Sequence, residues 1–206
     1  MSDRPENIRV FGFSDPSNVL QGIDDLRDYV NENGQCIVRG AVDSTVTRNS
    51  VKALKRGFSE KKDVRRSLEF KYGQTPNFQR LDIGTYGGGV FLFCRTFFIF
   101  PWNDDRLHLA DSLVAIARIK NALHELPDAY CLRGEEPVFY GMAIHQYPRG
   151  GGFMSGHRHS IEKDDDEGMR GGAFARHYTV GLVMSKIGED FAEGGGWSMP
   201  HVVKAS

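Results

Sequence analysis

One stretch of the sequence decides the predicted fold, and it reads Tyr147-Pro148-Arg149-Gly150-Gly151-Gly152-Phe153-Met154-Ser155-Gly156-His157-Arg158-His159. An alternating run from Val138 to Tyr147 leads into it, and a glycine turn separates that run from the two histidines. Alternation with a period of two is typical of a β-strand. The strand predicted here carries Phe139, Gly141, Ala143, His145 and Tyr147 on one face and Tyr140, Met142, Ile144 and Gln146 on the other.

The two histidines of this stretch are candidate metal ligands. His157 and His159 are two residues apart, so on a strand they point to the same side and can converge on one ion. Imidazole suits iron, zinc, copper and nickel, and an open coordination sphere admits further ligands. The sequence therefore predicts a metal site at His157 and His159.

The surrounding motifs resemble the core of the Fe(II)- and 2-oxoglutarate-dependent oxygenases over about residues 138–199. In that family an aromatic residue precedes a glycine-containing turn, a His-x-Asp or His-x-Glu pair follows, and a strand and an acidic-Gly-Gly turn come next. The positions that match in order and spacing are Tyr147, Gly150 to Gly152, His157, Thr179 to Met184, and Glu193-Gly194-Gly195.

The resemblance implies an α+β fold with a double-stranded β-helix core of the jelly-roll or cupin-like kind, which N-terminal helices support. It implies Fe(II) and 2-oxoglutarate as cofactors, and dioxygen and a small molecule as reactants. The substrate would be hydroxylated or desaturated. His157 would be the first iron ligand, and Tyr147 would hydrogen-bond the cosubstrate. Arg176 and Tyr178, beside the start of the next predicted strand, are weaker candidates for contacts with it.

Two departures from the family pattern bear on the site. The position of the expected acid is His159, and the acidic run Asp164 to Asp166 suits a solvated loop better than a ligand. The family's distal histidine comes at least two strands later, whereas His201 follows Trp197 by only four residues. The predicted β-helix is therefore incomplete at its C-terminal end, and its exposed strand edges favour pairing with another chain, including a second copy.

Two other interpretations stay open. One is a cupin-like metalloprotein in which only histidines, His157 and His159 among them, bind the metal without 2-oxoglutarate. The other is a catalytically incomplete module of the same fold, completed by a partner chain. The first requires that His159→Ala abolish metal binding, and a protein that is both monomeric and loaded with metal would argue against the second.

The remainder of the chain is predicted from periodicity and from helix-capping residues. Helices are expected over 15–34, 44–60 and 105–126, and short strands at 10–13 and 36–39. Residues 62–90 are polar and turn-rich and predict loops, and the aromatic segment 90–102 predicts a buried strand or a segment that packs on a helix. A further strand is expected over 178–185. The chain is treated as one domain, with helical support and first strands in 1–136 and the metal-binding β core in 137–206.

Composition excludes several functional classes. Lys plus Arg number 26 and Asp plus Glu 27, so no basic surface for nucleic acid is expected. No apolar run is long enough to cross a bilayer, and the polar N-terminus lacks the apolar segment of a signal peptide. The three cysteines show no zinc-binding spacing and suit free thiols in a reducing compartment. We therefore expect a cytoplasmic protein that contacts neither nucleic acid nor membrane.

Overall fold

The computed structural model describes residues 8–59, 73–86, 90–105, 107–132, 142–155, 178–190 and 192. The chain forms two compact units, which are described separately below. Unit 1 comprises residues 1–51, 111–128 and 178–206, and unit 2 comprises residues 52–110 and 129–177. Helices and an antiparallel sheet are both present, so the α+β class expected from the sequence is confirmed.

Unit 1 begins with a compact β-α-β arrangement. Strand β1 (Val10–Gly12) pairs in parallel with β2 (Ile37–Arg39), and helices α1 (Asn18–Gln21) and α2 (Ile23–Asn33) connect them. The sequence predicts one helix over 15–34, but Gly22 separates two. The end predicted at Gly34 is confirmed: its φ of +84° suits glycine, and its N–H donates to the Val30 carbonyl at 2.7 Å.

Two longer helices, α3 (Ser44–Ser59) and α4 (Ala110–Leu123), begin at aspartate caps. Asp43 Oδ1 accepts hydrogen bonds from the N–H groups of Thr45 and Val46, at 2.7 and 3.1 Å. Asp105 accepts from the N–H of Leu109 at 2.8 Å and of Ala110 at 3.0 Å. These carboxylates satisfy N–H groups that have no partner within the first helical turn, which explains where both helices start.

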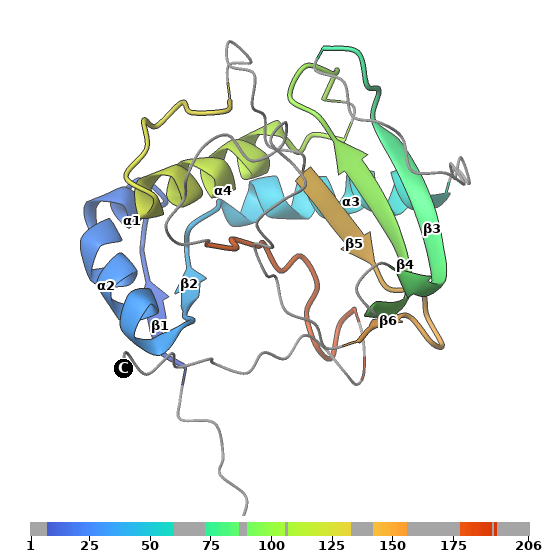
Figure 1. The fold of residues 1–206 in the computed structure, drawn as a ribbon, viewed down its shortest axis with the longest axis horizontal. Helices are drawn as coiled ribbons and strands as arrows, with labels where there is room; N and C mark the ends of the chain where they lie inside the picture. The colour runs from blue at the N-terminus through green and yellow to red at the C-terminus, as the bar shows by residue number, and fades with distance from the viewer. Residues whose placement is uncertain are drawn as a thin grey trace, which may run out of the picture. The chain divides into compact units, whose positions relative to one another are not determined.

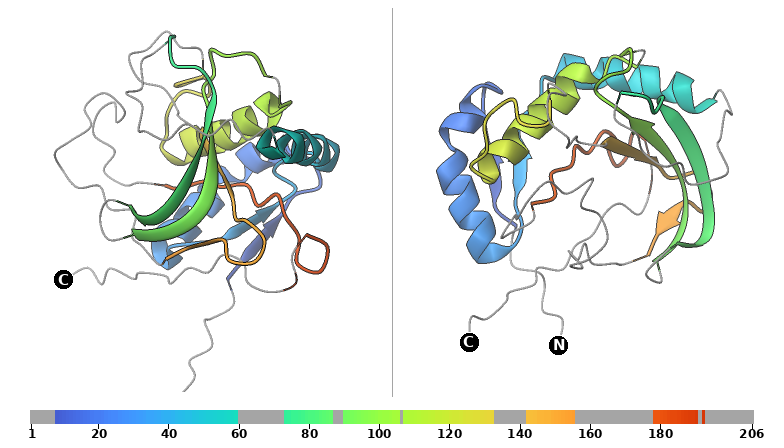
Figure 2. Two further views of the ribbon diagram at one scale, coloured as in Figure 1. Left: turned by 90° about the vertical axis from the view of Figure 1, so that its right-hand side faces the viewer. Right: turned by 45° about the horizontal axis from the view of Figure 1, so that its top comes forward.

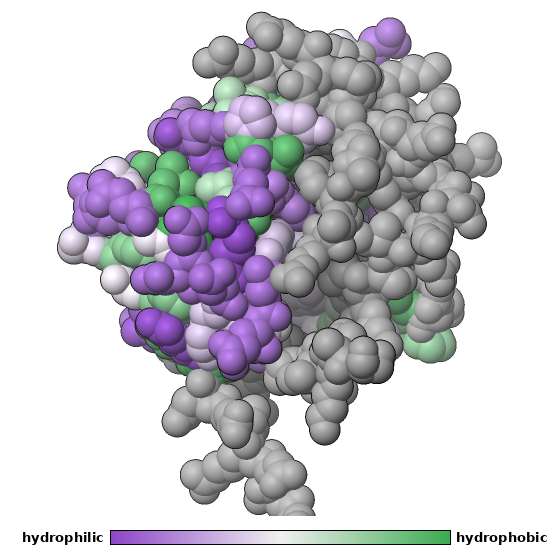
Figure 3. Space-filling view, turned by 60° about the vertical axis from the view of Figure 1, so that its left-hand side comes forward, coloured by the Kyte–Doolittle hydropathy of each residue, from purple (hydrophilic) through white to green (hydrophobic). Residues whose placement is uncertain are grey.

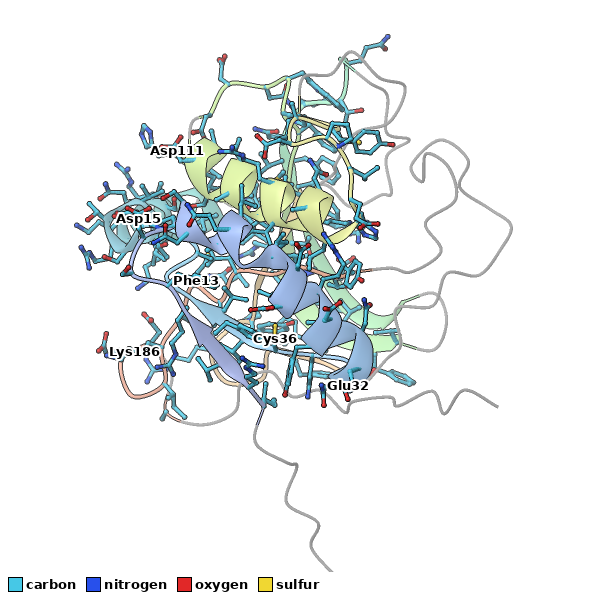
Figure 4. The ribbon with its side chains drawn as sticks, turned by 90° about the vertical axis from the view of Figure 1, so that its left-hand side faces the viewer. Phe13, Asp15, Glu32, Cys36, Asp111 and Lys186 are labelled. Atoms are coloured by element: carbon cyan, nitrogen blue, oxygen red, sulfur yellow. The ribbon has the colours of Figure 1, made fainter. Side chains whose placement is uncertain are left out.

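Unit 1 buries the polar residues Ser50, Ser112 and Asn121 as well as a hydrophobic cluster. The buried members of this cluster are Val19, Leu26, Ile119, Leu123 and Tyr178. Partly buried side chains pack around them, among them Phe13 and Cys36, and Figure 4 shows Cys36 between α2 and the two short strands. Hydrophilic residues cover much of the described surface on this side, as Figure 3 shows.

Unit 2 contains a four-stranded antiparallel sheet. Strands β3 (Phe78–Tyr86) and β4 (Val90–Ile99) form a long curved hairpin, and β5 (Met142–Gln146) and β6 (Phe153–Met154) both pair with the other side of β4 (Figures 1 and 2). The predicted strand at 138–147 is thus present from Met142, and 138–141 lie outside the described residues. Its predicted alternation is confirmed, because Met142, Ile144 and Gln146 are less exposed than Ala143 and His145.

The prediction of loops over 62–90 is wrong for Phe78–Tyr86, because these residues form strand β3 in continuous register with β4. Arg80 and Asp82 lie on one face of β3, opposite Thr96 and Cys94 of β4. Because this face is polar although largely buried, the sequence of β3 lacks a clear alternation of apolar and polar residues. The aromatic segment expected to be a strand or a helix-packing element is confirmed as strand β4 over Val90–Ile99.

The strand predicted over 178–185 is also corrected. No described strand pairs with this segment, although it keeps the predicted alternation of burial. Residues Tyr178, Val180, Leu182 and Met184 are less exposed than Thr179, Gly181, Val183 and Ser185. The side-chain pattern is therefore that of a strand, but a strand also needs a hydrogen-bonded neighbour, which the pattern does not specify.

Among the described helices, none combines the length and the apolar character that crossing a membrane requires. The three cysteines are free thiols, with Cys94 and Cys131 buried and Cys36 half-buried.

Candidate functional site

The candidate site is built on a strand that the glycine turn interrupts. β5 and β6 run in the same direction along β4, with Gln146 opposite Arg95 and Phe153 opposite Phe93. Residues 147–152 therefore stand against one β4 residue, Cys94. The turn does not reverse the chain: it is a loop inserted into a single strand, which is the outermost described strand on this side of β4.

The inserted loop has little conformational freedom. The Gly152 N–H donates to the Pro148 carbonyl at 2.8 Å, which closes the loop. Gly150 has a φ of +85°, a conformation that other residues rarely adopt. A Cβ on Gly152 would lie 2.4 Å from the Pro148 nitrogen and 2.5 Å from the Tyr147 carbonyl carbon, so no larger residue fits. Two of the three consecutive glycines are thus required by the backbone.

Beyond β6 the chain is attached to β4 by two hydrogen bonds. The Ser155 N–H donates to the Phe91 carbonyl at 2.8 Å, and the Phe91 N–H donates to Ser155 Oγ at 2.9 Å. Ser155 is the last described residue before the predicted ligand His157, two positions later. The structure therefore fixes the chain immediately before the predicted metal-binding pair.

One face of this sheet carries an unusual set of polar side chains, which we call the polar face. Residues directly opposite in adjacent strands point to the same side of a sheet, as do residues two apart in one strand. In the register of the three strands, this rule groups Arg80, Asp82, Cys94, Thr96 and His145.

Two interactions connect this polar face. Arg80 Nε donates to the Asp82 carboxylate at 2.8 Å, and both side chains are largely buried, at 12% and 17% exposed. Thr96 Oγ1 lies 3.0 Å from His145 Nδ1, in a hydrogen bond whose direction depends on the imidazole tautomer. Burial of so many polar groups costs free energy unless they are paired, so their pairing is needed for this face to be stable.

The Cys94 thiol belongs to the same network. Its Sγ lies 3.7 Å from Thr96 Oγ1. Burial raises the pKa of the Cys94 thiol above its ordinary value, and the Asp82 carboxylate adds to that rise, while the Thr96 hydrogen bond and Arg80 oppose it. The thiol is therefore protonated at neutral pH and is not an activated nucleophile.

Tyr147 lies at the first position of the inserted loop and is half-exposed. Burial raises the pKa of its hydroxyl, and the nearby Cys94 adds a smaller rise. Its hydroxyl thus remains a proton donor at neutral pH beside the polar face. This is the group that the oxygenase resemblance assigns to the cosubstrate.

An aromatic stack borders the polar face at the far end of β3 and β4. The rings of Phe78 and Phe98 stack at 4.7 Å, and those of Phe100 and Trp102 at 5.0 Å. The Arg80 guanidinium lies 5.2 Å from the centre of the Phe98 ring. This cation–π contact joins the stack to the ion pair.

The other predicted site residues are distributed differently. His157, His159 and Arg176 lie outside the described residues, as do the weaker candidates His201 and Asp164 to Asp166. Tyr178 is buried in the core of unit 1, where its hydroxyl donates to Asn31 Oδ1 at 2.6 Å and its ring packs against His124 at 4.8 Å. Within the part of the chain that the structure describes, no three His, Cys, Asp or Glu side chains could together hold a metal.

Most of the polar face was not among the residues selected from the sequence. His145 was placed on the correct strand face without a role, and Arg80 and Asp82 lie in the segment predicted as a loop. Cys94 and Thr96 alternate with Phe93, Arg95 and Phe97 in a run that is otherwise mostly aromatic and apolar. A polar residue at every second position within an aromatic strand is the signal that could have indicated them.

No family model, no curated protein and no solved structure matches this chain. The likeness to the oxygenase family thus stays a prediction from sequence motifs.

Proposed function

We propose that this chain is a non-haem, Fe(II)- and 2-oxoglutarate-dependent oxygenase with a double-stranded β-helix core that oxidises a small molecule. The observation that carries the proposal is the interrupted strand β5–β6. It places Tyr147 at the break, holds Ser155 on Phe91, and leads the chain into His157 and His159 after only one intervening residue. This order agrees with the aromatic residue, glycine turn and histidine of the oxygenase motif.

The sequence motif and the described residues together suggest how the site would work. His157 and His159 would hold the iron, which with 2-oxoglutarate and dioxygen supplies the oxidation of a substrate C–H bond. Tyr147 would donate a hydrogen bond from a hydroxyl whose raised pKa keeps it protonated. The buried Arg80–Asp82 pair and the Thr96–His145 hydrogen bond would hold the adjoining face of the sheet rigid, which preserves the geometry of the site.

Anaerobic titration of the metal-free protein with Fe(II), followed by 2-oxoglutarate, tests this proposal. We expect one bound iron, a visible absorption band on addition of 2-oxoglutarate, and succinate formation in air. His157→Ala should abolish all three, whereas His108→Ala, at an exposed histidine outside the motif, should change none. If wild type gives no band and His157→Ala binds metal equally well, the proposal is wrong.

Two substitutions at His159 distinguish an oxygenase from a histidine-only metalloprotein. His159→Asp supplies the carboxylate of the family motif, so an oxygenase should keep its iron and its 2-oxoglutarate band. A histidine-only site needs the imidazole, so His159→Asp and His159→Ala should both lose metal. Retention of metal in His159→Ala, with loss of activity alone, would exclude the histidine-only alternative.

A further inference from the structure

Among the described strands of unit 2, β3 lies at the edge of the sheet (Figures 1 and 2). It pairs with β4 along its whole length, from Phe78 opposite Phe98 to Tyr86 opposite Val90, and no other described strand pairs with it. An edge strand presents a row of backbone N–H and C=O groups in the plane of the sheet, and these groups can accept a further strand.

We infer that β3 pairs with β3 of a second copy of this chain, antiparallel and about a two-fold axis at Leu81. A two-fold axis perpendicular to a sheet pairs residues symmetrically about one position, and paired residues share a face. With Leu81 at the centre, Arg80 of each copy faces Asp82 of the other. The positive charge of Arg80 in each copy therefore lies opposite the negative charge of Asp82 in the other copy.

Neighbouring registers lack this complementarity. An axis at Asp82 would oppose two carboxylates, and an axis at Gln79 would place Arg80 opposite Phe78. Like charges directly opposite one another destabilise a strand pair, so charge favours the Leu81 register over one that is shifted by a single residue.

Backbone geometry limits the length of the pairing. Gly84 has a φ of +103°, which departs from the conformation of a regular strand. The regular part of β3 therefore runs from Phe78 to Ile83, and its centre lies between Arg80 and Leu81. A pairing centred on Leu81 uses Gln79 to Ile83 of this segment in both copies.

The burial of Arg80 and Asp82 is compatible with this pairing. Their side chains project from the face of the sheet, whereas the new hydrogen bonds form in its plane, at the edge. At 12% and 17% exposure, these charges are shielded from water, so a wrong register would be penalised more strongly than at an open surface. A formal net charge of −1 adds little repulsion between copies.

Cysteine cross-linking of the full chain tests the register. Leu81→Cys would place two thiols directly opposite, with Cβ atoms about 5 Å apart, close to the range of a disulfide. Ile83→Cys is the matched control: its own counterpart would lie four residues away along the strand, about 13 Å. Random collision would favour the control, because Ile83 is 72% exposed.

Under mild oxidation we expect a disulfide dimer of Leu81→Cys in non-reducing gels, with wild type and Ile83→Cys remaining largely monomeric. The wild type controls for the native cysteines. Equal cross-linking of the two variants, or more in Ile83→Cys, would overturn the inference.

Charge substitutions test the partner without introducing a thiol. Arg80→Asp makes this part of β3 wholly acidic, and Asp82→Arg makes it wholly basic, so each variant alone should shift to monomer in sedimentation across a concentration series. Mixing the two variants should restore a dimer of one copy of each. A wild type that stays monomeric at its highest soluble concentration would contradict the pairing. So would a mixture that does not associate although both variants keep the far-UV circular dichroism of the folded wild type.

Discussion

The core of unit 1 and the polar face of unit 2 bury very different side chains. The former consists of aliphatic residues and one tyrosine whose hydroxyl reaches Asn31. The latter buries an ion pair, a thiol and a threonine on a single sheet face. Apolar burial stabilises a fold directly, whereas polar burial does so only through well-formed pairs. Because unit 1 also buries the neutral polar residues Ser50, Ser112 and Asn121, the feature that distinguishes the polar face is its largely buried ion pair.

The largest expected effect comes from breaking the ion pair of the polar face. Asp82→Ala leaves the largely buried Arg80 guanidinium without this carboxylate, and we expect a loss of about 3 kcal/mol in the free energy of unfolding. In unit 1, Arg118 and Asp128 form a pair at nearly the same distance, 2.7 Å against 2.8 Å, but are 45% and 55% exposed.

Asp128→Ala is therefore the matched control, and it should cost less than about 1 kcal/mol. Urea denaturation of both variants measures the two values. Equal losses would show that the polar face is no more sensitive to lost charge than the surface of unit 1.

The inserted loop gives the next largest effect. Gly152→Ala forces a methyl group against the backbone of Tyr147 and Pro148, and we expect a loss of about 2 kcal/mol together with weaker metal binding. Gly151→Ala meets only the Phe93 ring at 3.9 Å, an ordinary contact, and should change stability by less than about 0.5 kcal/mol. Comparable stability of the two variants would contradict the loop geometry described above.

Tyr178→Phe tests whether this residue supports the core or binds a cofactor. Loss of its hydrogen bond to Asn31 should cost about 1 kcal/mol in thermal or urea unfolding. Tyr29→Phe is the control, because its hydroxyl accepts only a longer, exposed bond from the Arg9 N–H at 3.3 Å. Should Tyr178→Phe weaken 2-oxoglutarate binding without any cost in stability, the cofactor role predicted from the sequence would be favoured instead.

The smallest effect concerns the pH dependence of helix α3. Hydrogen bonds from the N–H groups of Val46 and Thr45 lower the pKa of Asp43 below its ordinary value. A lowered pKa in the folded state adds stability above the unfolded pKa, and this stability disappears as pH falls through the folded pKa. Below about pH 4 the melting temperature of wild type should therefore fall more steeply than that of Asp43→Asn. Parallel curves would show that the cap contributes no pH dependence.

Local signals in the sequence determined much of unit 1 and one strand of unit 2. Gly34 after α2 and the alternation over Met142–Gln146 each act through neighbours in the chain, so short patterns were sufficient. The candidate metal-binding pair, His157 and His159, likewise comes from sequence alone and stays a prediction.

Only the tertiary structure revealed the inserted loop, strand β3 and the polar face. The glycine stretch looked like a turn between two elements, yet pairing with β4 on both sides makes it an insertion in one strand. Arg80 and Asp82 looked like loop residues, because single charged side chains favour water. In the structure they form an ion pair on one face of the sheet, and this pairing lets both charges lie in a strand. Their position on that face depends on the register in which β3 and β4 are hydrogen-bonded.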